Sequence, residues 1–218
     1  MEFIYGEQEL EHLRKKDKRL AEAIDRIGHI HRPVDTDLFT SVIHQIVGQQ
    51  ISSAAQRTDW KRFCEAVGDV TPENVCAKSE EDLKSLGMTY RKAGYILDFA
   101  QKVKSGEFDI AALEAMDDEE VKKSLCALRG IGAWTAEMLM IFCMQRPDIV
   151  SYGDLAILRG MRMLYRKKEI DRATFERYCK RYRPYGTTAS MYLWAISGGA
   201  LPELTDPAAP KKKGASKK

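Results

Sequence analysis

Apolar side chains recur every three or four positions along most of this chain. The segment from Phe39 to Val47 shows this spacing clearly, and Thr36 or Asp37 stands where a helix N-cap is expected. A break at residues 48–52 separates this segment from a second one, which Gly68 ends. Further helices are predicted over about 79–87, 91–104, 109–116, 118–127, 133–144, 155–165, 172–182 and 187–197.

No run of alternating apolar and polar residues is long enough to form a β-sheet. The pattern therefore predicts an all-α fold of close to ten helices with short connections. We expect a six-helix lobe over residues 36–134 and a second helical lobe made of residues 1–35 and 135–200. Residues 201–218 contain five lysines and little to bury, which predicts a disordered basic tail.

The composition is that of an ordinary globular protein, with 44% hydrophobic and 31% charged residues among 218. The longest apolar run stops at Gln145, well short of the roughly 20 residues that a membrane helix needs. The N-terminus lacks the basic start and apolar core of a secretory signal. We expect no contact with a membrane and a location in the cytoplasm.

The cysteines argue against a metal or disulfide framework. There are five, an odd number, and no pair has the spacing of a zinc or iron–sulfur motif. We expect them to be mostly buried thiols in a reducing compartment and predict no iron–sulfur cluster. They stand at positions Cys64, Cys76, Cys126, Cys143 and Cys179.

The net charge of +3 is unevenly distributed. Residues 1–128 carry a net charge of −6, whereas residues 129–183 carry +6. A basic segment of this kind suits a polyanionic partner, because neutralised phosphates release their counterions. The alternative is a solvated helix face with paired charges, and charge alone does not decide between the two.

A short segment, Leu128-Arg129-Gly130-Ile131-Gly132, lies between two predicted helices. Its two glycines permit a tight turn, and Ile131 can fill the groove between the helices. The backbone amides of residues 130–133 would then point outward at a helix N-terminus, where an anion such as a DNA phosphate binds. A plain helix–helix turn is the alternative, and the longer string through Trp134, Thr135 and Ala136 weighs against it.

Four segments together resemble the helix–hairpin–helix (HhH-GPD) DNA glycosylase superfamily, and most closely its 3-methyladenine DNA glycosylase II branch. Only about 35 residues precede Leu38, which points to the compact form without an extra mixed α/β domain. The resemblance implies two helical lobes flanking a DNA-binding cleft. The four segments are residues 46–52, 86–96, 128–136 with 150–156, and 183–194.

The resemblance assigns the catalytic role to Asp154. A fixed carboxylate opposes the positive charge that develops on the deoxyribose and can orient or deprotonate the attacking water. The alternative is that Asp154 only caps a helix. Related enzymes that also cut the strand have a lysine where this chain has Trp134, so the resemblance implies a monofunctional hydrolase.

The resemblance also supplies candidates for the base pocket and for DNA binding. Trp134 and Trp194 match aromatic positions that stack on a cationic base, although both could instead be core residues. Met138 replaces a tyrosine of the best-known relatives, which leaves the breadth of substrates open. Tyr152 and Tyr185 complete the expected pocket. The expected DNA contacts are Gln49, Gln50, Gly130, Ile131, Gly132, Ala133 and Thr135, with Gln49 or Gln50 as the wedge or only as a polar helix break.

As in relatives, the backbone carbonyls of Cys126, Leu128 and Ile131 are candidates to hold a structural monovalent cation; no catalytic cofactor is expected. The predicted function is monofunctional excision of alkylated purines, 3-methyladenine and 7-methylguanine, from double-stranded DNA by a monomer after base flipping, leaving an abasic site. Alternatives are a glycosylase of the same superfamily for oxidised or mismatched bases, and a non-enzymatic DNA-binding module.

Overall fold

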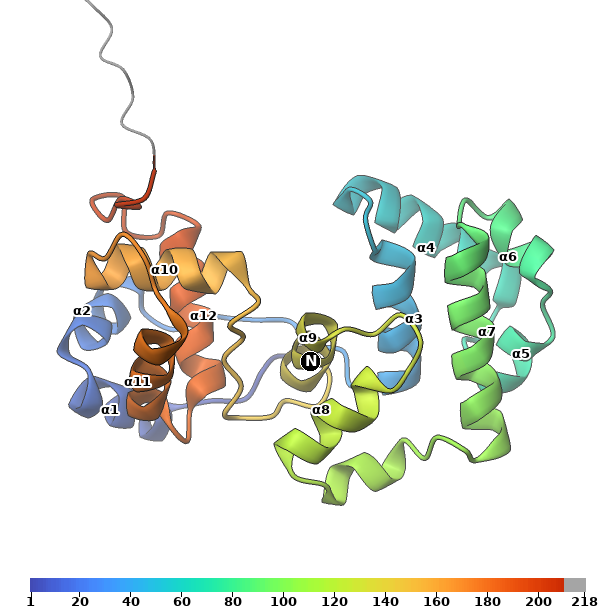
Figure 1. Cartoon of the computed structure of the whole chain (residues 1–218), viewed down its shortest axis with the longest axis horizontal. Coiled ribbons are helices and arrows are strands. Elements are labelled where there is room, and N and C mark those ends of the chain that lie inside the picture. The colour runs from blue at the N-terminus through green and yellow to red at the C-terminus, as the bar shows by residue number, and fades with distance from the viewer. Residues whose placement is uncertain (210–218) are drawn as a thin grey trace, which may run out of the picture. The chain divides into compact units, whose positions relative to one another are not determined.

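The structure is a computed structural model that describes residues 1–209 (Figure 1). This part of the chain contains twelve α-helices and one 3-10 helix, and its only β pairing is an isolated bridge between Glu2 and Pro33. The predicted all-α class is confirmed, with somewhat more helices than expected because the short segments at 72–76 and in the N-terminal region are helical. None of the described helices combines the length and the apolar character needed to cross a membrane.

The chain divides into two units, and the first consists of residues 33–146 with Met1 and Glu2. Helix α3 is its centre, because it packs against α4, α7 and α9 and buries Val42, Ile43 and Ile46 completely. The elements of this unit are α3 (Leu38–Gly48), α4 (Ser53–Val67), α5 (Pro72–Cys76), α6 (Glu80–Ser85), α7 (Tyr90–Ser105), η1 (Ala111–Ala115), α8 (Asp118–Cys126) and α9 (Ala133–Phe142).

The second unit consists of residues 3–32 together with the chain from Pro147 onward. Its helices are α1 (Glu7–Lys16), α2 (Lys18–Ile27), α10 (Leu155–Tyr165), α11 (Arg172–Tyr182) and α12 (Gly186–Ser197). Helix α12 is buried along most of its length and contacts the other four. Gly160 lets α10 approach α12 closely, since a Cβ there would lie 2.2 Å from the Leu193 carbonyl oxygen.

The boundary between the units differs from the predicted one. All of helix α9 belongs to the first unit, which extends to Arg146 rather than to 134. The reason is the strongly apolar composition of α9, whose residues 136–141 are buried where the helix packs on α3 and α8. Apolar periodicity identified the helix but did not show which lobe would cover it.

The beginning of the predicted disordered tail is packed against the second unit. Leu201 is buried, and the Asp206 carboxylate accepts two hydrogen bonds from the Arg162 guanidinium, at 2.9 and 2.6 Å. Arg26 also pairs with Glu203. The prediction of disorder is therefore wrong for residues 201–209, and the rest of the predicted tail, residues 210–218, lies outside the described residues.

Candidate active site

The connection between α8 and α9 is a tight hairpin built on Gly130. This residue has a φ of +86°, and a Cβ there would lie only 2.3 Å from Cδ2 of Tyr95, so both its backbone conformation and its neighbour require glycine. Ile131 is buried, and its amide donates to the Leu128 carbonyl at 3.1 Å. Ile131 is therefore a buried residue of the turn, in agreement with the sequence prediction.

The N-terminus of α9 is open to a ligand. Gly132 is its N-cap, and no side chain caps the helix, unlike α10, where Asp154 does so. Gly132 and Ala133 are exposed, and the first intrahelical bond runs from the Ala136 amide to the Gly132 carbonyl at 2.9 Å. The amides before Ala136 at this terminus have no intrahelical acceptor, which is the arrangement that binds a phosphate oxygen.

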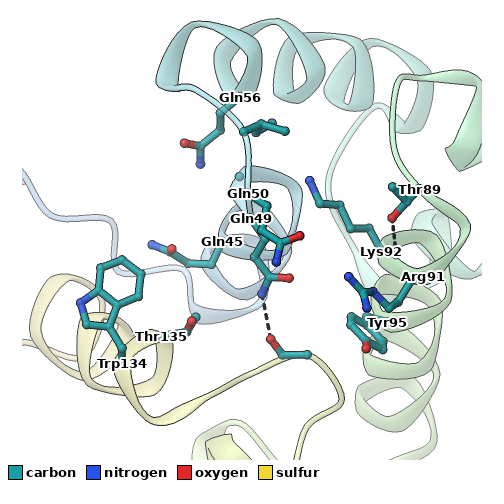
Figure 2. A pocket seen from close by; sticks show the side chains of 13 residues that line it. Gln45, Gln49, Gln50, Gln56, Thr89, Arg91, Lys92, Tyr95, Trp134 and Thr135 are labelled. Atoms are coloured by element: carbon teal, nitrogen blue, oxygen red, sulfur yellow. Dashed lines mark hydrogen bonds between the residues drawn. The ribbon is translucent and has the colours of Figure 1, made fainter. Parts of the chain in front are cut away.

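Residues 49–52, the glutamine loop, connect α3 to α4. Gln49 turns toward the hairpin, where its side-chain amide donates to the Gly130 carbonyl at 2.8 Å (Figure 2). Gln50 is exposed and has a φ of +57°, in the left-handed region that a non-glycine residue rarely adopts. The two neighbours therefore differ in role: Gln49 is tied to the hairpin, and Gln50 is the exposed residue at the tip.

Two further side chains hold this loop. The Lys92 ammonium donates to the Val47 carbonyl at 2.8 Å and so occupies an acceptor in the last turn of α3. Burial lowers the pKa of Lys92, and nearby Asp59 partly opposes this. On the other side, Gln56 approaches His44 with 3.3 Å between their Nε2 atoms and packs where any Cβ on Gly48 would stand.

A cavity of about 700 Å³ opens between the glutamine loop, the start of α7, the hairpin and the start of α9 (Figure 2). Five of the residues that the sequence assigned to the site, namely Gln49, Gln50, Gly130, Trp134 and Thr135, line it. Trp134 is 46% exposed, so it is not a core residue. The full lining is Gln45, Gly48, Gln49, Gln50, Ile51, Gln56, Thr89, Arg91, Lys92, Tyr95, Gly130, Trp134 and Thr135.

Asp154 belongs to the second unit and caps α10. Its Oδ1 atom accepts the amides of Ala156 at 2.8 Å and Ile157 at 3.0 Å, which fixes the carboxylate in one orientation. Only 8% of the residue is exposed, whereas the next residue, Leu155, is 80% exposed. Asp154 therefore does cap α10. The same two bonds hold its carboxylate in one orientation at a poorly solvated position, where charge interactions are stronger than in water.

The other expected pocket residues have separate surroundings. Met138 is buried in the first unit and does not line the cavity. In the second unit, Tyr152 packs edge-on against Phe175 and lies under the Arg172 guanidinium. Tyr185 accepts a hydrogen bond from Gln8 at 2.9 Å. Trp194 is half-buried on α12.

Among residues 1–209, no group of three or more histidine, cysteine or acidic side chains is placed to hold a metal ion. All five cysteines are free thiols; Cys143 is buried and Cys126 is exposed. Burial raises the pKa of Cys143 to about 11 and that of Cys179 to about 12. These two thiols are therefore protonated and unreactive at neutral pH.

The comparison with known families decides the assignment of this fold. Residues 43–184 match the sequence model described as HhH-GPD superfamily base excision DNA repair protein. The chain belongs to this superfamily. The hairpin, the glutamine loop and Asp154 all lie within the matched residues.

Individual HhH-GPD relatives agree with the match. DNA-3-methyladenine glycosylase 1 of Schizosaccharomyces pombe is 30% identical over 179 residues, which is 80% of this chain and 78% of that protein. The crystal structure of DNA-3-methyladenine glycosidase from Bacillus halodurans matches with a TM-score of 0.84 and 34% identity over 89% of this chain and 91% of that chain. A 3-methyladenine DNA glycosylase from S. pombe in complex with abasic DNA matches with a TM-score of 0.76 and 26% identity, over 91% and 99% of the two chains.

Sequence reasoning missed several residues of this HhH-GPD site. Lys92, Arg91 and Tyr95 line the cavity, and Gln45 and Gln56 face it from the other side. The sequence signal for Arg91 and Lys92 was their place, as a basic pair, at the start of a helix that Thr89 caps. The segment 86–96 contributed to the resemblance, but these side chains were not assigned to the site, because a basic pair on a helix surface is common and only the fold brings it beside the glutamine loop.

Proposed function

We propose that this chain is a monofunctional DNA glycosylase that removes alkylated purines, 3-methyladenine and 7-methylguanine, from double-stranded DNA in base excision repair. The relatives that are named DNA-3-methyladenine glycosylase support the substrate class. The observation that carries the enzymatic assignment is the Asp154 carboxylate, which two backbone amides fix at the start of α10. Asp17 is held in the same way as the cap of α2, so the cap alone does not carry the assignment. The position of Asp154 does, because it stands where the resemblance to HhH-GPD glycosylases puts the catalytic acid, and a protein that only bound DNA would need no carboxylate there.

The reaction acts on a nucleotide that has left the duplex, because the sugar carbon of a stacked base is out of reach. The bond between C1′ and the purine nitrogen breaks, its electron pair goes to the cationic base, and the base leaves uncharged. A water oxygen bonds to C1′, and the water proton passes to the Asp154 carboxylate and then to solvent. Asp154 also opposes the positive charge on the sugar in the transition state.

The other residues grip and read the DNA. The amides at the start of α9 bind a backbone phosphate, and exposed Gln50 enters the space that the base has vacated. Trp134 offers a ring face to the cationic base, an attraction of roughly 0.5–2 kcal/mol. Trp194, Met138, Tyr152 and Tyr185 shape the pocket of the complex in this proposal. Because no lysine stands at position 134, water is the nucleophile and the product is an abasic site.

The hairpin carbonyls remain our proposed position for a structural monovalent cation. The Leu128 carbonyl accepts the Ile131 amide and keeps a second lone pair, so it can still bind an ion. Such an ion would bridge the hairpin to a DNA phosphate and take no part in bond cleavage. We also propose that the enzyme works as a monomer where chromosomal DNA is found, at the nucleoid or in a nucleus.

The test is release of free base from methylated duplex DNA by wild type and by Asp154→Asn. Asparagine keeps the capping oxygen but lacks the charge, so we expect folding and DNA binding to persist while the rate falls by at least about 100-fold. Gln101→Ala, at an exposed position of α7, is the control and should leave the rate unchanged. Equal rates for wild type and Asp154→Asn would overturn the mechanism, and no release by wild type would favour a DNA-binding module.

A further inference from the structure

A second hollow, of about 580 Å³, lies in the second unit and is strongly basic. It is formed where α1 passes into α2, where α10 ends, and along one side of α11. It differs from the cavity of the first unit in that six of its nine lining residues are basic. The basic residues that line it are Lys16, Lys18, Arg19, Arg166, Lys167 and Arg181.

The floor of this hollow is a buried hydrogen-bond network. Asp17 is only 4% exposed, and its Oδ2 atom accepts the Tyr165 hydroxyl at 2.8 Å and the Arg181 guanidinium at 3.0 Å. The Tyr165 and Tyr182 hydroxyls lie 2.7 Å apart, and burial raises the pKa of both. The network therefore stays intact at neutral pH and fixes the guanidinium of Arg181.

The acid at this site, Asp17, forms an ion pair with only one of the cations, Arg181. Both oxygens of Asp17 are already occupied, because Oδ1 accepts the amides of Arg19 and Leu20 at 3.1 Å while Oδ2 binds Tyr165 and Arg181. Within residues 1–209, the exposed side chains of Lys16, Lys18, Arg166 and Lys167 form no ion pair. Lys167 also interacts electrostatically with Asp171. Four basic side chains without an ion pair raise the positive potential around the hollow, which attracts an anion.

We propose that this hollow binds phosphate groups of a nucleic acid backbone, as a second contact separate from the reaction site. A bound mononucleotide fits less well, because the aromatic rings give its base nowhere to stack. Tyr165 and Tyr178 are buried and stack on each other with centroids 3.8 Å apart, and Arg181 and Arg177 lie over the Tyr178 ring. The hollow offers positive charge but no pocket for a base. This suits contact with a nucleic acid backbone irrespective of the base sequence.

The hollow is remote from the proposed catalytic acid within the same unit. Asp154 caps the first turn of α10, whereas Tyr165 and Arg166 end that helix, and its eleven residues span about 16 Å. The proposal therefore goes beyond base excision. Phosphate contacts at this distance would add affinity for undamaged duplex, on which a glycosylase must search for rare lesions, without altering the chemical step.

The experiment compares the double variant Lys18→Gln/Lys167→Gln with the matched control Lys61→Gln/Lys104→Gln, which removes the same charge from α4 and α7 of the first unit. Affinity for a long undamaged duplex is measured at several salt concentrations. Loss of two phosphate contacts should reduce the slope of log affinity against log salt by about 1.8 for the first variant only. Thermal unfolding of both variants checks that the fold is retained.

Two more measurements separate the possible outcomes. Single-turnover base release at saturating enzyme should be the same for the double variant and wild type, which also distinguishes this proposal from the proposed excision reaction. Inorganic triphosphate is the probe for a small-anion site. The backbone proposal would be overturned if triphosphate stabilised the wild type against thermal unfolding while the salt slope of DNA affinity was the same for Lys18→Gln/Lys167→Gln as for wild type. An unchanged slope without such protection, or equal slopes for both double variants, would overturn it as well.

Discussion

The side-chain amide of Gln49 donates a hydrogen bond of 2.8 Å to the carbonyl of Gly130. This bond joins the loop after α3 to the α8–α9 hairpin, two segments that lie 81 positions apart in the chain (Figure 2). The loop carries the proposed wedge, Gln50, and the hairpin carries the proposed phosphate grip. This partly buried contact therefore helps to set the position of the wedge relative to the phosphate that the hairpin is proposed to hold.

The first prediction concerns this bond. Gln49→Ala removes the donor, and we expect a loss of about 1 kcal/mol in the free energy of unfolding and weaker binding to lesion-containing duplex, because the loop is no longer tied to the hairpin. Gln50→Ala is the matched control, since it truncates an exposed neighbour. It should leave thermal stability unchanged while lowering base release. Equal stability losses for the two variants would show that the hydrogen bond does not support the loop.

The second prediction uses the two hairpin glycines. Gly130→Ala places a Cβ 2.3 Å from the Tyr95 ring at a φ of +86°, so we expect a loss of roughly 2–4 kcal/mol in the free energy of unfolding. Gly132→Ala meets nothing within 4 Å and has a φ of −93°, so it should be tolerated in the free protein. Chemical denaturation measures both. A stable Gly130→Ala would mean that Tyr95 moves easily.

Most of the fold followed from local patterns. The cap at Asp37 and the glycine stop at Gly68 set the limits of two helices to within a residue or two, because capping acts between neighbours in sequence. The hairpin was predictable for the same reason. What local patterns could not show was which unit would cover α9, since an apolar helix has no sequence mark for its partner.

The same distinction between local patterns and contacts of distant segments applies to the candidate site. Asp154 and the hairpin were visible as motifs, whereas Lys92 was not, because its role depends on reaching the Val47 carbonyl 45 positions away. Residues 201–209 show the same limit. Their composition indicated disorder, yet one carboxylate, Asp206, finds Arg162 and holds the segment in place. Contacts between segments that are distant in the sequence are therefore the features of the site and the fold that could not be predicted.

The third prediction separates the structural and chemical roles of Asp154. Asp154→Ala removes the cap of α10 as well as the charge, and it should cost about 1 kcal/mol in the free energy of unfolding. Asp154→Asn keeps an oxygen for the amides of Ala156 and Ile157, so its loss should be smaller, while both variants lose base release. If the Asp154→Asn variant were as unstable as the Asp154→Ala variant, the charge itself would be required for the cap. Calorimetry and the base-release assay together distinguish these cases.

The fourth prediction concerns pH. Burial lowers the pKa of His44 below its usual value, with Asp35 partly opposing the effect, and the edge of the His44 ring meets Trp60 at a centroid distance of 4.8 Å. The unfolded chain therefore binds a proton more readily than the folded chain. It follows that the contribution of neutral His44 to stability is fully present above about pH 6.5 and is lost as pH falls below it.

The measurement is the difference in free energy of unfolding between wild type and His44→Gln at pH 8 and at pH 5. Glutamine does not titrate, so the advantage of wild type should shrink as pH falls, by at most about 1.4 kcal/mol per pH unit. The effect has a consequence for the site, because Nε2 of the neutral His44 ring lies 3.3 Å from Nε2 of Gln56 and can accept its amide hydrogen, whereas the protonated ring cannot. Gln56 in turn packs on Gly48 beside the glutamine loop. Protonation of His44 should therefore loosen the loop before the unit unfolds. The protection factors of the amides of residues 48–52, which correct for the intrinsic effect of pH on exchange, should fall between pH 7 and pH 5 in wild type but not in His44→Gln. Protection factors that fall equally in both proteins would show that another group controls the loop.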